Sequence, residues 1–234
     1  MNPVHVKICG IRKGDNLDFT SSPKITHVGF VFEEASSRYV NPYDAQKLVS
    51  QVHSSCVPVG VFRNKDVSAV VKACKLANIQ TVQLHGNESS VDCHSLKSFG
   101  LTVWKCISIP AFNPDAEQIL NHAKQYTNDV DAILFDSSVR NKGSSQVITG
   151  GLGISFSWSM LGGKDGLISR LSPVNVWVAG GINPENAAKL LDICDPFGID
   201  ISSGVEHEGR KSAERIAEII KVVSSGEANF KYAR

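Results

Sequence analysis

The sequence has no apolar run long enough to cross a membrane and no surplus of charge of one sign. A spanning helix needs about 20 consecutive apolar residues, whereas the apolar runs here are short. The chain carries 24 Lys and Arg against 23 Asp and Glu, which gives a formal net charge of +1 at pH 7. Because binding to nucleic acid or to an anionic membrane usually needs a basic surplus, we expect neither partner.

Cysteine pairing is also missing. The six cysteines include no C-x-x-C pair and no zinc-ligand spacing, which argues against a disulfide framework and for reduced thiols. Residues 1–4 lead into a strand without a charged-then-apolar targeting segment. We therefore expect a cytoplasmic protein, and 234 residues suffice for one sizeable core.

The sequence does contain a regular alternation of short apolar runs and helical stripes. The runs cover residues 4–8, 27–32, 58–62, 81–84, 101–107, 132–135, 174–179 and 198–201. Apolar residues at i, i+3, i+4 and i+7 lie between several of them, as at Val67, Val70, Val71 and Cys74. This alternation favours an α/β fold, a single-domain (β/α)8 TIM barrel with eight parallel strands over residues 1–234.

Local signals refine this prediction. Asn41-Pro42 and Asn183-Pro184 predict two helix starts, each with an N-cap side chain and an N1 proline. The first crossover, 12–26, lacks apolar periodicity and predicts a short or irregular helix. The polar, glycine-rich segment 137–155 is typical of a mobile active-site lid, and 226–234 is interpreted as a C-terminal tail.

Two residues with exchangeable protons end apolar runs, where a barrel of this kind carries its active site. Cys9 follows the first run, and Asp136 follows the sixth. We interpret them as a proton-transfer pair, although a buried cysteine is more often a core filler and a strand-end aspartate is as often a turn former. Lys7 either biases Cys9 toward thiolate or binds a carboxylate inside the barrel, and the sequence leaves both readings open.

Other polar residues at strand ends suggest an anionic ligand. Gly180-Gly181 follows the seventh run and Ser202-Ser203 the eighth, and the loops after these strands commonly bind phosphate. A lone Gly-Gly is more often a turn, but the second loop favours a phosphate site. Arg38 either grips a substrate carboxylate bidentately or is a solvated loop residue.

His85 raises the question of a metal. Its neighbours Glu88 and Asp92 do not complete a convincing ligand set, so we predict no metal. Gln83 is interpreted as a neutral hydrogen-bonding residue that contacts substrate or neighbouring loops.

Taken in order along the whole chain, the strand-end motifs resemble those of the phosphoribosylanthranilate isomerases. They are Lys7-Ile8-Cys9-Gly10; Gly29-Phe30-Val31-Phe32 followed by Ser37-Arg38; Val59-Gly60-Val61-Phe62; Val82-Gln83-Leu84-His85-Gly86; Leu134-Phe135-Asp136-Ser137; Ala179-Gly180-Gly181 followed by Pro184-Glu185-Asn186; and Gly198-Ile199-Asp200-Ile201-Ser202-Ser203-Gly204-Val205-Glu206.

The resemblance implies an isomerase of tryptophan biosynthesis. Its reaction is the Amadori rearrangement of N-(5-phosphoribosyl)anthranilate to 1-(2-carboxyphenylamino)-1-deoxyribulose 5-phosphate, and it needs no cofactor. The partner would be this small phosphosugar alone, and the enzyme a monomer or homodimer. By position, the implied roles are general base for Cys9, general acid for Asp136, substrate binding for Arg38, Gln83 and Asp200, and phosphate binding for Gly180, Gly181, Ser202 and Ser203.

Two positions depart from the family pattern, and two rival functions remain. Leu152 and Ser157 stand where the family usually has Thr and Asp, so lid closure or helix capping is expected to differ. A histidine-pathway isomerase would use two aspartates, and Cys9 argues against it. A catalytically idle barrel that binds phosphorylated ligands or a partner enzyme remains the alternative.

Overall fold

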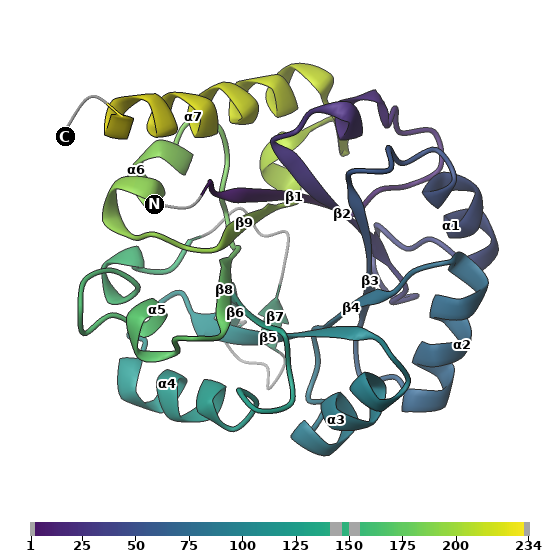
Figure 1. Ribbon diagram of the computed structural model, residues 1–234, viewed down its shortest axis with the longest axis horizontal. Helices are drawn as coiled ribbons and strands as arrows, with labels where there is room; N and C mark the ends of the chain where they lie inside the picture. Colours follow the sequence, from purple (N-terminus) through teal and green to yellow (C-terminus); the bar gives the residue numbers. More distant parts are fainter. Residues whose placement is uncertain (1–2, 141–146, 150–154, 232–234) are drawn as a thin grey trace.

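Eight parallel strands close into a barrel in the computed structural model, which describes residues 3–140, 147–149 and 155–231 (Figure 1). The barrel strands are β1 (His5–Cys9), β2 (Ile25–Val31), β3 (Val57–Phe62), β4 (Thr81–Leu84), β5 (Thr102–Pro110), β6 (Ala132–Arg140), β8 (Asn175–Val178) and β9 (Gly198–Ile201). β5 pairs with β6, and β9 pairs with β1, so these strands form a closed ring. The predicted TIM barrel is confirmed.

Helices surround the ring on its outer side (Figure 1). They are α1 (Pro42–Val49), α2 (Val67–Ala77), α3 (Ser90–Ser98), α4 (Ala116–Lys124), α5 (Leu167–Arg170), α6 (Ala187–Ile193) and α7 (Ala213–Lys231). As predicted, Asn41 caps α1 and Pro42 is its first residue. The first crossover holds a 3-10 helix, η1 (Asp18–Ser21), which confirms its irregularity. No helix in the described ranges is long and apolar enough to span a membrane.

Several element boundaries in the structure differ from the sequence predictions. α6 begins at Ala187 rather than Pro184, because Asn183 and Asn186 exchange hydrogen bonds of 2.9 and 3.0 Å that form a turn first. β6 continues five residues beyond the predicted run, to Arg140, and pairs antiparallel with β7 (Val147–Thr149). The predicted tail, 226–234, begins inside α7, whose backbone is helical to Lys231.

The proposed lid, 137–155, falls largely outside the described residues. Ser137 and Ser138 at its start are buried in β6, while 141–146 and 150–154 are not described. Ser157 precedes a short 3-10 helix, η2 (Trp158–Met160), and its Oγ contacts Ser159 Oγ at 2.9 Å without capping the helix. The gating role of this segment stays a prediction.

Apolar side chains fill both the barrel interior and the layer between strands and helices. Alternate residues of a strand point to opposite faces, which divides the buried residues into these two layers. The interior layer consists of Val59, Trp104, Cys106, Ala132, Leu134, Trp177 and Ala179. In it, the rings of Trp104 and Trp177 stack at 4.6 Å between centroids.

His27 of β2 packs against these tryptophans. Its ring centroid lies 5.1 Å from that of Trp104 and 4.9 Å from that of Trp177. Burial, together with the nearby charge of Lys7, lowers the pKa of His27 to about 3. His27 therefore stays neutral in the folded protein near pH 6.5, where the same side chain takes up a proton in the unfolded chain.

Acid should weaken the fold through this histidine. The unfolded chain takes up a proton on His27 near the ordinary pKa of 6.5, whereas the folded chain does so only near its lowered pKa of about 3, so stability falls as pH decreases between these values. The free energy lost approaches about 1.4 kcal/mol per pH unit for one such group. Urea unfolding of the wild type and of His27→Phe should show a steeper decline for the wild type in this range, and parallel curves would contradict the assignment.

Candidate active site

The C-terminal ends of the strands surround a cavity of about 420 Å³. All of the residues that the sequence predicts for the site line it: Cys9, Arg38, Gln83, Asp136, Gly180, Gly181, Asp200, Ser202 and Ser203. They lie on four barrel strands, β1, β4, β6 and β9, or in the loops that follow β2, β8 and β9, and the parallel closed ring brings those strand ends together. The predicted and observed locations of these residues therefore agree.

Cys9 lies at the end of β1 beside a buried ion pair. Lys7 Nζ is 2.8 Å from Asp200 Oδ2, and Lys7 and Asp200 are directly paired in the register of β1 and β9. Burial raises the pKa of Cys9, and the positive charge of Lys7 opposes that rise without cancelling it. Both readings of Lys7 therefore hold: it binds a barrel carboxylate and it favours the thiolate.

Asp136 on β6 faces His85, which follows β4. His85 Nε2 lies 3.2 Å from Asp136 Oδ2. Burial alone would lower the pKa of His85, but the influence of Cys106 and Asp136 outweighs it, and the pKa lies well above its usual value. The Asp136 carboxyl group thus lies close enough to His85 to favour the protonated imidazole. Sequence reasoning misses this contact, for which the one signal is that both residues follow apolar runs of the sequence.

Glu88 and Asp92 are occupied by structural contacts. Glu88 pairs with Lys105 at 2.8 Å and accepts hydrogen bonds from the backbone of Asn64 and Gly86. Asp92 forms the capping box of α3 with Ser89. Neither is available as a metal ligand beside His85.

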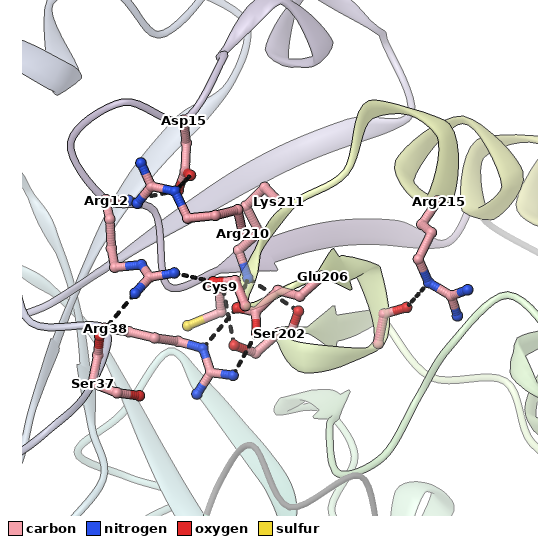
Figure 2. A network of polar contacts seen from close by, with 12 residues as sticks. Cys9, Arg12, Asp15, Ser37, Arg38, Ser202, Glu206, Arg210, Lys211 and Arg215 are labelled. Carbon is pink, nitrogen blue, oxygen red and sulfur yellow. Dashed lines mark hydrogen bonds and ion pairs between the residues drawn. The ribbon is translucent and has the colours of Figure 1, made fainter.

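The guanidinium of Arg38 forms an ion pair with the Glu206 carboxylate (Figure 2). Arg38 Nε and Nη2 donate to Glu206 Oε1 and Oε2, each at 2.8 Å. Glu206 also accepts from Lys211 at 2.9 Å, and both lie on the hairpin of β10 (Glu206–His207) and β11 (Arg210–Lys211). A Cβ on Gly10, which has a φ of +85°, would lie 2.4 Å from Arg38 Cδ, so glycine makes room for this side chain.

This contact limits how Arg38 can bind a ligand. A guanidinium has five N–H donors on two usable edges, and Glu206 takes the Nε–Nη2 edge. Burial alone would raise the pKa of Glu206, but Arg38 and Lys211 outweigh it and lower the pKa, so the carboxylate stays ionised at neutral pH. The carboxylate of a ligand would therefore bind the Nη1–Nη2 edge of Arg38.

The predicted phosphate residues surround another part of the cavity. Gly180 has a φ of +89°, and a Cβ there would lie 2.6 Å from the backbone nitrogen of Ser137, so the turn requires glycine. Ser203 begins a short 3-10 helix, η3 (Ser203–Val205). Ser202 Oγ donates to the carbonyl oxygen of Cys9 at 3.1 Å, which leaves its lone pairs rather than its proton for other contacts.

Two buried acceptors in the cavity wall lack hydrogen-bond partners among the described residues. They are Gln83 Oε1 and Asp200 Oδ1. A buried acceptor without a donor is costly, and both residues line the cavity. The arrangement suits a ligand with hydroxyl groups.

Comparisons with known proteins agree with this architecture. The family model for N-(5'-phosphoribosyl)anthranilate (PRA) isomerase matches residues 6–222. The N-(5'-phosphoribosyl)anthranilate isomerase of Clostridium acetobutylicum is 36% identical over 217 residues, covering 93% of this chain and 96% of that protein. Its counterpart from Thermoanaerobacter pseudethanolicus is 34% identical, covering 94% of this chain and 98% of that protein.

Solved structures show the same likeness. The phosphoribosyl anthranilate isomerase of Thermotoga maritima superposes with a TM-score of 0.77 at 30% identity, covering 95% of this chain and 99% of that one. A phosphoribosyl anthranilate isomerase in complex with reduced 1-(o-carboxyphenylamino)-1-deoxyribulose 5-phosphate gives a TM-score of 0.75 at 29% identity, with the same coverage. Family model, relatives and fold together establish that this chain belongs to the N-(5'-phosphoribosyl)anthranilate isomerase family.

Proposed function

We propose that the chain isomerises N-(5-phosphoribosyl)anthranilate by general acid and base catalysis, with Asp136 as the acid and Cys9 as the base. The observation that carries these roles is that Cys9 and Asp136 line one cavity from separate strands, with β8 and β9 between them on one side of the ring. An acid and a base on different walls can act on two atoms of one sugar. The rearrangement needs such a pair.

The chemistry assigns one step to each group. A proton from the Asp136–His85 pair goes to the ring oxygen, the bond from C1 to that oxygen breaks, and a Schiff base forms. The Cys9 thiolate then removes the proton from C2, and the electron pair of that bond shifts to give the enolamine. Protonation at C1 and loss of the hydroxyl proton at C2 yield the ketone, so no external oxidant or reductant is needed.

The remaining cavity residues account for binding. Arg38 offers its Nη1–Nη2 edge to the anthranilate carboxylate, while Glu206 fixes the adjacent Nε–Nη2 edge. Gln83 and Asp200 present acceptors to the sugar hydroxyls. The backbone N–H groups around Gly181 and Ser203 suit the phosphate, because glycine lets an anion approach the main chain closely.

The wider assignment follows the sequence predictions. We place the chain in the cytoplasm, acting on this small molecule as a monomer or homodimer. The idle-barrel alternative is disfavoured because one cavity retains both proposed proton carriers, Cys9 and Asp136.

Replacing Cys9 by alanine should remove most turnover. With phosphoribosylanthranilate made in situ and the loss of anthranilate fluorescence as the readout, kcat should fall about 10²- to 10⁴-fold, while product affinity is retained. Cys93→Ala is the matched control, because that thiol is also buried but lies outside the cavity. Full activity in Cys9→Ala would refute its role as the base.

Replacing Asp136 by asparagine should be comparably damaging, because an amide keeps the shape but has no acidic proton for the ring oxygen. An open-chain substrate analogue that bypasses ring opening should restore the rate of Asp136→Asn and leave Cys9→Ala inactive. Equal rescue of both variants would show that Asp136 does not act in the ring-opening step.

Glu206→Gln should weaken binding of the substrate carboxylate without changing the chemical steps. One charge-assisted contact that orients Arg38 is lost, so we expect KM to rise about tenfold with kcat within about threefold. The check is a second substrate, the corresponding N-(5-phosphoribosyl)aniline, which lacks the carboxylate and should show no difference between wild type and Glu206→Gln.

Glu185→Gln is the matched control for this prediction. Glu185 also accepts hydrogen bonds from an arginine, because Arg215 Nη2 donates to both of its carboxylate oxygens at 3.0 and 3.1 Å, but Glu185 lies outside the cavity. A KM increase in Glu206→Gln that is equal for both substrates would mean that Glu206 supports the fold and does not position Arg38 for the carboxylate.

A further inference from the structure

A third side chain with a metal-binding atom lies next to the Asp136–His85 pair. Cys106 is on β5, which lies between β4, just before His85, and β6, which carries Asp136. One donor atom from each of the three residues lies within 4.8 Å of the others. Cys106 and Asp136 are each 4% exposed. The cluster combines sulfur, imidazole and carboxylate ligands, and the proposed catalytic roles make no use of Cys106.

The topology explains why these donors meet. Cys106 belongs to the interior layer of the barrel, and on β6 the alternation of Ala132 and Leu134 continues inward to Asp136. In the register of β5 and β6, Cys106 is paired with Leu134, two residues before Asp136. The thiol therefore lies just below the cavity floor that His85 and Asp136 form.

From this placement we propose that Cys106, His85 and Asp136 form a binding site for Zn²⁺, which inhibits the enzyme reversibly by capturing the residue proposed as its general acid. The inhibition rests on the proposed function, whereas the metal site itself does not. Zinc bonds of about 2.0 to 2.3 Å in a tetrahedral arrangement separate ligand atoms by roughly 3.3 to 3.8 Å. The distance from His85 Nε2 to Asp136 Oδ2 is already 3.2 Å, so a small approach of the sulfur completes the set.

The ligand chemistry selects the metal. A thiolate with an imidazole suits zinc and similar thiophilic ions, whereas Mg²⁺ and Ca²⁺ prefer oxygen ligands. On binding, the thiol and the Asp136–His85 pair release their protons to solvent. Three protein ligands leave a fourth position for water, which the cavity supplies on the side lined by His85 and Asp136.

Gln83 provides the outer contact that such a site requires. Its amide nitrogen lies 3.3 Å from His85 Nδ1, the side chain is 1% exposed, and its Oε1 has no hydrogen-bond partner among the described residues. Rotation of the amide by half a turn brings this unpartnered oxygen to an Nδ1–H. Metal-bound histidines almost always donate that proton to a neighbouring acceptor, and the same rotation frees Nε2 for the metal.

The test combines a direct binding measurement with an inhibition assay on the metal-free full-length chain. Titration with Co²⁺, which replaces zinc and is coloured, should give a thiolate-to-cobalt charge-transfer band that saturates at one ion per chain. The band should persist in Cys9→Ala and disappear in Cys106→Ala. Because this readout needs no turnover, it decides the metal site even if the isomerase activity is absent.

Inhibition is then measured with ZnCl₂ in the fluorescence assay. Micromolar Zn²⁺ should abolish wild-type activity, EDTA should restore it, and Mg²⁺ should have no effect. Relative to its own rate without zinc, Cys106→Ala should need at least about tenfold more Zn²⁺ than the wild type for half inhibition, whereas Cys93→Ala should respond like the wild type. Cys106→Ser provides a second variant, closer in volume, should the alanine variant fail to fold.

Three outcomes would overturn the proposal. The first is absence of the cobalt band in the wild type, and the second is an unchanged band in a folded Cys106 variant. The third is half inhibition at the same Zn²⁺ concentration in the wild type and that variant, which would assign the effect to another site, such as Cys9.

Discussion

The buried ion pair between Lys7 and Asp200 is the interaction on which both the barrel closure and the site depend. It joins β1 to β9, the first and last strands of the ring, in direct register. Two charges removed from water are tolerated only when each compensates the other, and loss of one partner leaves a strongly destabilising buried charge. The same lysine lies beside Cys9. A change at Lys7 would therefore alter both the contact between β1 and β9 and the electrostatic environment of the Cys9 thiol.

Much of the fold and site could be predicted from the sequence because both follow from local patterns. Strand alternation with helical stripes specifies a parallel barrel, and a parallel barrel collects its strand ends at one face. The location of Cys9 and Asp136 at the active-site face could be predicted from that rule alone, and both residues line the cavity. The caps show where local patterns lose precision: Asn41 begins α1, whereas Asn183 begins a turn that delays α6 to Ala187.

The features that the sequence could not reveal are contacts between distant residues. Arg38 and Glu206 are 168 positions apart, and nothing local to either indicates that one edge of the guanidinium is occupied. Ser137 and Ser138 resemble loop residues in composition, yet pairing with Ile109 and Pro110 of β5 keeps them in β6. Pairing with a neighbouring strand, rather than the intrinsic preference of the residues, decides the secondary structure of such segments. The meeting of His85, Cys106 and Asp136 across three strands is of the same kind.

The pairing of charges around the cavity also explains how a nearly neutral chain can serve an anionic substrate. Lys7 and Asp200 cancel each other, so they fix the thiol environment without attracting anions. Arg38 and Lys211 share the single carboxylate of Glu206. The three side chains together therefore retain one positive charge. That charge matches one substrate carboxylate, while backbone N–H groups bind a phosphate without contributing formal charge. A net charge of +1 over 234 residues therefore sets no limit on anion binding, because recognition depends on how each cation is neutralised at the cavity wall.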